Sequence, residues 1–271
     1  MNHNIGEFIA QKRKELGYTQ QKLAEQLNIS FQAVSKWEKG ISAPDISLLP
    51  QMAQILNTSV DALVGYNYVP KTMYEEKYKS EEYYWGIIPN RMCYEIMKLR
   101  PPVKPYRVLD IGCGEGKDAV FLARNGYKVS AFDIADAGLE KARRLAEHHQ
   151  VEVDFFRADM NDYIPSAEFD IIFCSGVFAY VNLSQRKLLI DRLKESTSRH
   201  GIHAVNVFVN KPFIKEAPDK EEWAEHWYSG ELFSYYHDWL FHWSEEIIFD
   251  CNSGGIPHKH CMESLIGEKM V

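Results

Sequence analysis

Three glycines in the stretch "DIGCGEG" have the spacing of a turn that brings the backbone close to a ligand. A helix that follows the turn would add its free N–H groups. A dinucleotide site would carry G-x-G-x-x-G, whereas Gly112, Gly114 and Gly116 give G-x-G-x-G and Lys117 takes the last glycine's place. Asp110 suits a cationic ligand better than a pyrophosphate. The stretch therefore favours S-adenosylmethionine (SAM), whose amino and sulfonium groups are positive.

Acidic residues follow the next two apolar runs. Asp133 ends "KVSAFD", 21 residues after Gly112, where a carboxylate can accept bonds from both ribose hydroxyls. Asp159 in "RADM" can bind the adenine amino group while the main chain near Met160 contacts the ring. The alternatives are a helix cap for Asp133 and a solvated loop residue for Asp159. The expected cofactor-binding residues are Asp110, Gly112, Cys113, Gly114, Gly116, Asp133, Ile134, Asp159, Met160 and Ser175.

Short apolar runs alternate with helical patterns from Arg107 onward, which is typical of an α/β fold with a parallel sheet. Ligands of such sheets bind outside the carboxyl ends of the strands. We expect helices to begin at Lys117, Ala135 and Ser184. The expected strands are "RVLDIG", "KVSAFD", "VDFFRAD", "DIIFCSG" and "HAVNVFV".

Aromatic residues flank the first and fourth expected strands and can cover a cationic cofactor with their ring faces. Methyl transfer from a sulfonium is an in-line displacement that depends on alignment and on exclusion of water. A thiolate or a reduced metalloid needs no general base, whereas an oxygen or nitrogen acceptor often does. Tyr83 is expected only to pack, and no catalytic residue is assigned. The pocket candidates are Tyr84, Trp85, Phe178 and Tyr180, joined by His258 and His260.

The two histidines belong to "CNSGGIPHKHC", which begins at Cys251. In a strand, His258 and His260 point to one face and Cys261 to the other. The imidazoles can hold a metal, orient an acceptor or serve the structure alone. The spacing matches no common zinc pattern, so we assign no metal.

Residues 1–66 contain apolar positions at helical spacing in short segments. We expect five short helices, with a tight turn at Asn28–Ile29. Six basic and six acidic residues make this segment neutral. The residues that can cap its helices are Thr19, Ser30, Asp45 and Ser59.

The strings "LGYTQQKLAEQLNIS", "VSKWEKG" and "LNTSVDALVG" resemble the helix-turn-helix domain of the Cro and phage-repressor class, the XRE family. The resemblance implies that the helix after Ser30 enters the major groove of a double-stranded DNA operator, as a homodimer. It places Gln32, Ser35 and Lys36 on bases and Gln20 and Gln21 on phosphates. The alternative is a protein-docking or dimerisation module, which the neutral charge also allows.

The later strings "EEKYKS", "VLDIGCGEGKDAVFLARNGYKVSAFDIADAGLEKA", "FDIIFCSGVFAYV" and "SGELFSYYHDW" resemble class I SAM-dependent methyltransferases, and more narrowly the tellurite-resistance branch. The resemblance implies a Rossmann-like, mostly parallel sheet of seven strands. Its last strand is antiparallel and is formed by "HKHCMESLIG" beside "EEIIFDC". We therefore expect a helix-turn-helix domain over 1–66, a linker and helical lid over 67–100, and a methyltransferase domain over 101–271.

The totals limit the function further. The formal charge of −7 falls entirely after residue 66, so the second domain has no general attraction for a polyanion. Methyltransferases that act on base amines carry an acid or Asn followed by Pro-Pro and an aromatic, where this chain has "CSGVFAYV". A small-molecule acceptor is therefore favoured over DNA, and protein methylation is left open. The remaining alternative is a transcription factor that senses SAM or a ligand without turnover.

Five scattered cysteines predict reduced thiols rather than a disulfide framework. No run reaches the roughly 18 apolar residues needed to span a bilayer, and the amino terminus lacks a signal-peptide pattern. We expect a cytoplasmic protein without a membrane partner.

Overall fold

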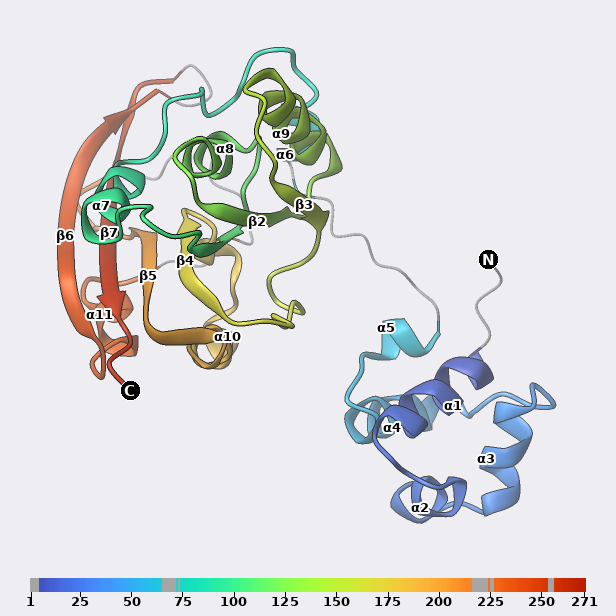
Figure 1. Cartoon of the computed structure of the whole chain (residues 1–271). Helices are drawn as coiled ribbons and strands as arrows, with labels where there is room; N and C mark the ends of the chain where they lie inside the picture. The colour runs from blue at the N-terminus through green and yellow to red at the C-terminus, as the bar shows by residue number, and fades with distance from the viewer. Residues whose placement is uncertain (1–4, 65–71, 73, 216–223, 225–226, 253–255) are drawn as a thin grey trace. The chain divides into compact units, whose positions relative to one another are not determined.

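The structure is a computed structural model that describes residues 5–64, 72, 74–215, 224, 227–252 and 256–271 (Figure 1). The chain divides into two compact units, Met1–Pro70 and Lys71–Val271. Among the described residues, no helix is long and apolar enough to cross a membrane. Residues 74–100, which we expected to be linker and lid, contain two helices of the second unit.

The N-terminal unit contains the five predicted α-helices. Its core is formed by apolar residues from all of them, with Ile9, Leu23, Val34 and Met52 fully buried. The elements are α1 (Ile5–Glu15), α2 (Gln20–Gln26), α3 (Phe31–Glu38), α4 (Leu49–Ile55) and α5 (Val60–Leu63), with a 3₁₀ turn at Ile46–Leu48.

Capping side chains set where these helices begin. Thr19, Ser30 and Ser59 accept backbone N–H bonds at the starts of α2, α3 and α5, and Asp45 does so for the 3₁₀ turn. The turn between α2 and α3 passes through Asn28 at φ +53°, a left-handed conformation that asparagine tolerates. The predicted caps and the predicted turn are confirmed.

The second unit is built on a seven-stranded sheet with the order β3-β2-β1-β4-β5-β7-β6. Strands β1 to β5 pair in parallel, and β7 pairs antiparallel with both β5 and β6. The predicted topology is therefore confirmed, with β6 beginning earlier than expected. The strands are β1 (Arg107–Ile111), β2 (Lys128–Asp133), β3 (Asp154–Arg157), β4 (Phe169–Ser175), β5 (Thr197–Val209), β6 (Leu240–Cys251) and β7 (His258–Glu268).

Helices cover both faces of this sheet (Figure 1). Apolar residues of α7 and α8 pack on the face that carries Val108 and Ile171, whereas α10 and α11 pack on the face of Leu109 and Ile172. Two apolar cores result, one on each face. The helices are α6 (Tyr74–Lys77), α7 (Arg91–Leu99), α8 (Lys117–Arg124), α9 (Asp136–His148), α10 (Leu183–Glu195) and α11 (Glu231–Tyr235), with a 3₁₀ turn at Phe178–Tyr180.

The parallel strands bring their carboxyl ends to one edge of the sheet. Because β7 runs antiparallel, its first residue, His258, lies at this same edge beside the last residue of β6. The loops that follow β1, β2, β3 and β4 therefore share the edge with the end of the β6–β7 hairpin at which the chain passes from β6 to β7.

Candidate active site

The glycine loop joins β1 to α8 and is packed too tightly for side chains. Gly112 has φ +67°, and a Cβ added there would lie 2.5 Å from Cγ2 of Val177. Gly116 has φ +83°, and its added Cβ would lie 2.6 Å from the Cβ of Ala142. Both positions need glycine because of the backbone conformation and the close neighbours together.

Asp110 lies beneath this loop with an unused acceptor. Its carboxyl is 2% exposed, and Oδ2 has no hydrogen-bond partner among the described residues. Burial raises the pKa of Asp110 well above its ordinary value, and the nearby Asp118 raises it further, against the opposing charge of Lys117. A cationic donor beside Oδ2 would lower that pKa again and satisfy the oxygen. The arrangement fits the ammonium group of SAM.

Asp133 holds the glycine loop from the end of β2. Its Oδ2 accepts from the Gly114 N–H at 2.8 Å, and Oδ1 accepts from the Ala135 N–H at 2.9 Å. Burial raises the pKa of Asp133 even though the bonds from Ala135 and Gly114 oppose that shift. Each carboxylate oxygen can accept a second bond, so the structural role leaves capacity for ribose hydroxyls.

Asp159 follows β3 at the expected place. Its Oδ1 accepts from both the backbone N–H and the side-chain amide of Asn161, each at 2.9 Å. The neighbouring Met160 is buried, and the Ile134 carbonyl accepts from Arg157. Asp159 thus lies where we predicted it, and its carboxylate also stabilises a local turn with Asn161.

An aromatic cluster covers the glycine loop. Tyr74 stacks on Tyr78 with ring centroids 5.6 Å apart, and it also contacts Tyr84, Trp85 and Tyr180 at 5.7 to 6.4 Å. Trp85 donates its indole N–H to the Tyr78 hydroxyl at 3.2 Å. That hydroxyl would lie 2.9 Å from a Cβ added to Gly114, so the cover reaches the loop itself.

A buried ion pair fixes this cover in place. Lys141 Nζ lies 2.5 Å from Glu115 Oε1, and both side chains are 2% exposed. Lys141 also donates to the Glu82 carbonyl, and Glu115 accepts from the Trp85 N–H. The loop, α9 and the covering segment are joined through one pair of charges that would be costly to separate.

Ser175 lies at the end of β4 between two asparagines. Its Oγ accepts from Asn90 Nδ2 at 3.0 Å and from Asn206 Nδ2 at 3.1 Å, while Asn206 Oδ1 accepts from the Gly176 N–H at 2.7 Å. This polar chain ties α7, β4 and β5 together beside the glycine loop's edge.

Comparison with known proteins identifies both units. Residues 108–201 match the family model described as a methyltransferase domain, and residues 9–63 match a helix-turn-helix model. The chain carries a helix-turn-helix domain followed by a methyltransferase domain.

Two curated relatives match the methyltransferase domain. A probable S-adenosyl-L-methionine-dependent methyltransferase, TehB of Haemophilus influenzae, is 26% identical over 139 residues, covering 51% of this chain and 48% of its own length. A putative methyltransferase of a Geobacillus species is 29% identical over 135 residues, covering 46% and 55%. The chain thus spans about half the length of these relatives.

The crystal structure of TehB from Haemophilus influenzae shares the fold. It superposes with a TM-score of 0.60 at 21% identity, covering 72% of this chain and 65% of that one. This likeness shows that the two chains share a fold.

One pocket candidate of the methyltransferase domain, Phe178, lies elsewhere than predicted. Phe178 is 1% exposed and packs in the core against Trp227, whose indole N–H donates to the Phe178 carbonyl. From the 3₁₀ turn that contains both residues, Tyr180 contacts the aromatic cover and Phe178 does not. Tyr83 packs against α9, as expected.

The sequence did not single out Tyr78, Asn90 or Asn206. Tyr78 stands in a run of aromatic residues, which was a signal for cover but did not distinguish its members. The asparagines meet Ser175 only because α7, β4 and β5 converge. Cys113 is half-buried in the glycine loop and Cys174 is buried, and burial raises the pKa of both thiols.

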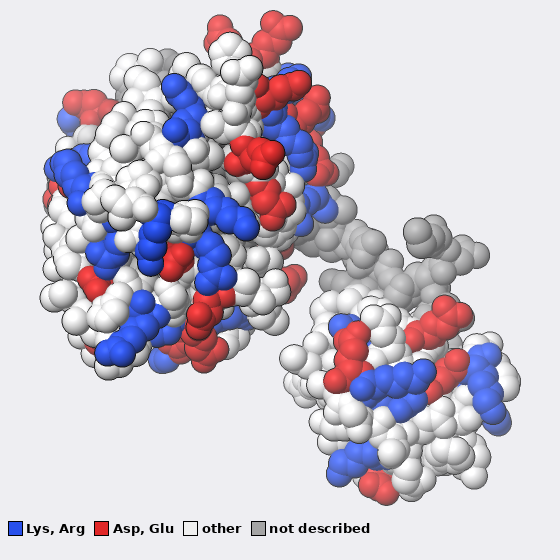
Figure 2. Space-filling model, in the orientation of Figure 1, with Lys and Arg blue, Asp and Glu red and all other residues white. Residues whose placement is uncertain are grey.

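In the helix-turn-helix domain, α3 carries the three predicted base-reading residues. Gln32 and Lys36 are exposed and Ser35 is half-buried. Figure 2 shows basic and acidic side chains interspersed over the visible face of this domain. The mixed surface agrees with its zero net charge.

Gln20, for which we predicted a phosphate contact, also has a structural role. Its amide donates to Glu38 Oε2 at 2.7 Å, and Glu38 also pairs with Arg13 at 2.6 Å. This network ties α1, α2 and α3 together because Arg13 is buried and needs a partner. Gln21 is exposed and contacts only Glu25 among the side-chain bonds described.

Proposed function

We propose that the methyltransferase domain transfers the methyl group of SAM to a small-molecule acceptor, and that the helix-turn-helix domain binds an operator as a homodimer. The aromatic cover over the glycine loop carries the first part of this proposal. Ring faces favour a sulfonium cation, and closure by Tyr78 and Trp85 excludes water from it.

The residues of the loop fit the other parts of the cofactor. Asp110 offers a buried acceptor for the amino group, and Asp133 offers remaining acceptor capacity for the ribose hydroxyls. Asp159 and the main chain at Met160 lie after the third strand, where we place the adenine ring. SAM supplies an electrophilic methyl group, and the chain aligns the acceptor with it and excludes water.

We infer a soft, anionic acceptor such as a thiolate or a chalcogen oxyanion. Such an acceptor is already nucleophilic and needs no general base. The sequence resemblance to the tellurite-resistance branch supports this class. A cover built from short segments that pack directly on the glycine loop also favours a small acceptor over a polymer.

A second function is ligand sensing without turnover. The cover begins at Tyr74, only eleven residues after the last residue of α5, so it is close in sequence to the DNA-binding domain. In this function SAM alters operator affinity, and by linkage the operator alters SAM affinity by the same factor.

The two functions are separated by measuring S-adenosylhomocysteine after incubation of the full chain with SAM and candidate acceptors. The panel contains selenite, tellurite, small thiols, halides and small amines. Methyl transfer predicts product with a thiol or a chalcogen oxyanion. Tight SAM binding, no product with any acceptor and a SAM-dependent operator affinity would instead support sensing.

A further inference from the structure

Three potential metal ligands meet at the end of the β6–β7 hairpin where the chain passes from β6 to β7. Cys251 ends β6 and pairs in register with His258, the first residue of β7. Directly opposed residues of an antiparallel pair project to the same face, and His260 shares that face because it lies two residues further on. Strand register therefore brings together residues that their sequence spacing did not mark as a metal site.

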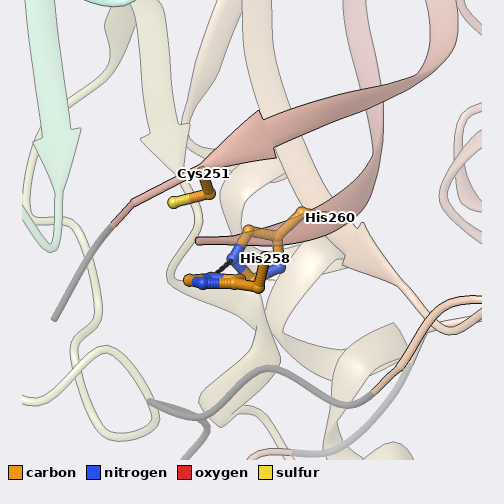
Figure 3. Close-up of side chains that lie close together, drawn as sticks. All are labelled: Cys251, His258 and His260. Atoms are coloured by element: carbon orange, nitrogen blue, oxygen red, sulfur yellow. Dashed lines mark hydrogen bonds between the residues drawn. The ribbon is translucent and has the colours of Figure 1, made fainter. Parts of the chain in front are cut away.

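The ligand atoms are close enough for one ion. The Cys251 sulfur and one nitrogen of each imidazole all lie within 4.8 Å of one another (Figure 3). The two Nε2 atoms are 2.8 Å apart, with the rings nearly perpendicular at 85°. Tetrahedral zinc, at its usual bond lengths, needs about 3.3 Å between nitrogens and about 3.5 Å from nitrogen to sulfur. Shifts of about an ångström in these nitrogen and sulfur atoms would convert the present arrangement into tetrahedral zinc ligation.

A backbone carbonyl orients His258 for this role. His258 Nδ1 lies 2.6 Å from the Ile256 oxygen, and a carbonyl can only accept, so Nδ1 carries the proton. In the neutral ring, Nε2 then presents its lone pair toward His260. Donation of the outer ring nitrogen to a carbonyl is the arrangement that fixes metal-ligating histidines.

Aromatic rings shield the other imidazole. The Phe208 and Phe249 rings lie 4.7 Å and 5.7 Å from the ring of His260. An apolar surround of this kind restricts water and strengthens ligation. Lys259, between the two histidines, pairs instead with Asp250, and Cys261 is buried toward the opposite core.

We propose that Cys251, His258 and His260 bind a zinc-class transition-metal ion, with a fourth coordination position open to solvent or to a small ligand. One thiolate and two imidazoles are borderline-soft donors that suit Zn²⁺ and Co²⁺ better than Mg²⁺ or Ca²⁺. Metal entry replaces the hydrogen bond between the imidazoles, moves the Nε2 proton of His260 to its Nδ1 by exchange with solvent, and releases the thiol proton. This proposal does not rest on methyl transfer.

The ion would lie at the functional edge of the sheet. Phe208, which packs on His260, also lies beside Gly176, where an added Cβ would be 3.3 Å from its ring. Gly176 directly follows Ser175 at the end of β4. The metal site is therefore one aromatic side chain away from the loop after β4, which contributes Tyr180 to the aromatic cover.

The test uses Co²⁺ as the probe on the full chain, stripped with chelator and kept reduced. We expect one Co²⁺ per chain, with the absorption of a tetrahedral ion and a thiolate-to-cobalt charge-transfer band. Zn²⁺ should displace the cobalt and raise the melting temperature by mass action. Cys251→Ser should lose the charge-transfer band, and His258→Gln or His260→Gln should lose stoichiometric binding.

Cys261→Ala and Lys259→Gln are the matched controls, because they alter a thiol and a side chain of the same strand that face away from the cluster. Both should keep the band and the zinc-induced shift in melting temperature. The proposal is overturned if the unaltered chain takes up no cobalt stoichiometrically. It is equally overturned if the band survives in Cys251→Ser or disappears in Cys261→Ala instead.

Discussion

At the scale of single residues, Asp133 shows how a binding group is positioned before its ligand arrives. Its two bonds to the backbone at Gly114 and Ala135 fix the carboxylate and the loop in one arrangement. A preset acceptor costs little ordering free energy when the ligand binds. The same bonds mean that a substitution here acts on the loop as well as on the ligand.

Asp133→Asn should weaken SAM binding by roughly tenfold to a hundredfold. Replacing the charged acceptor removes about 1.5–3 kcal/mol from bonds to ribose hydroxyls. Isothermal titration calorimetry of the full chain measures the change. Asp136→Asn is the control, because Asp136 is exposed three residues later at the start of α9. Equal affinities for SAM in both variants would remove Asp133 from the site.

His203 makes the stability of the second domain depend on pH. Burial lowers the pKa of His203 to about 3, with Lys194 and Lys269 lowering it further, while Thr197 and Tyr236 occupy the two ring nitrogens. Unfolded histidine titrates near 6.5. Between these values the unfolded chain binds the proton and the native chain does not, so stability is lost as pH falls from about 6.5 toward about 3.

We therefore expect the melting temperature of His203→Gln to depend less on pH below about 6.5 than that of the unaltered chain. Thermal unfolding is recorded at several pH values between 7 and 4. The variant should have a lower melting temperature at pH 7, but this temperature should fall less between pH 7 and 4 than that of the unaltered chain. His237→Gln, at an exposed position, should follow the unaltered chain. Parallel curves for His203→Gln and the unaltered chain would show that His203 does not control this slope.

Residue types alone were enough to find the acids and glycines of the loop, since their spacing is local and follows strand ends. They were not enough for Tyr78, Asn90 or Asn206, which meet the site through tertiary packing. Phe178 was misplaced for the same reason. In its 3₁₀ turn Phe178 points into the core and Tyr180 points toward the aromatic cover. The sequence could not predict this because the core position of Phe178 depends on Trp227, which is distant in sequence.

At the scale of elements, the glycine loop depends on what packs against it. Gly112 approaches Val177 in the loop after β4, and Gly116 approaches Ala142 of α9. The loop is thus a junction between three segments, and its shape is fixed by contacts as much as by its own backbone. Helix caps and the alternation of strands with helices were predictable because they rest on local chemistry and on the apolar pattern. The antiparallel last strand was implied by the family resemblance. The meeting of Cys251 with His258 depends on hairpin register, which the sequence did not specify.

Gly112→Ala should destabilise the methyltransferase domain more than Gly86→Ala. Both glycines have φ +67°, so each alanine pays the same left-handed strain of about 1–2 kcal/mol, but nothing lies within 4 Å of a Cβ at Gly86. Overlap with Val177 adds about 1–3 kcal/mol at Gly112. Urea unfolding followed by circular dichroism measures the difference.

The double variant Gly112→Ala/Val177→Ala tests the cause. It should recover part of the loss, because the shorter side chain removes the Cγ atoms that the new Cβ would meet. If the two substitutions are simply additive, the close contact at Gly112 does not determine the stability of the loop.

At the scale of the whole molecule, a helix-turn-helix domain with no net charge precedes an acidic methyltransferase domain in the chain. A DNA-binding domain with no net charge gains little from non-specific attraction to phosphates, so we expect operator binding to depend on base contacts and on pairing of two copies. The division into two units, which falls after Pro70, was predictable to within a few residues from the change in sequence pattern after residue 66. The operator sequence could not be predicted, because it depends on exposed side chains whose binding partners are DNA bases and not other residues of the chain.

Gln32→Ala and Lys36→Ala should each weaken operator binding by about 1–3 kcal/mol and relax preference at one or two base positions. The operator is first selected from random duplexes, and affinity is then followed by fluorescence anisotropy. Two half-sites about one helical turn apart are expected for a homodimer. Gln54→Ala, exposed on α4, is the control. Selection that yields no preferred sequence would contradict operator binding.

The most direct measurement follows the methyl group itself. The full chain is incubated with SAM carrying a deuterated methyl group and with selenite or a small thiol, and the products are identified by mass spectrometry beside the Asp133→Asn variant. Methyl transfer predicts S-adenosylhomocysteine and an acceptor that carries the labelled methyl group, both strongly reduced in the variant. SAM that binds but keeps its label, with no labelled acceptor, would contradict the proposed activity.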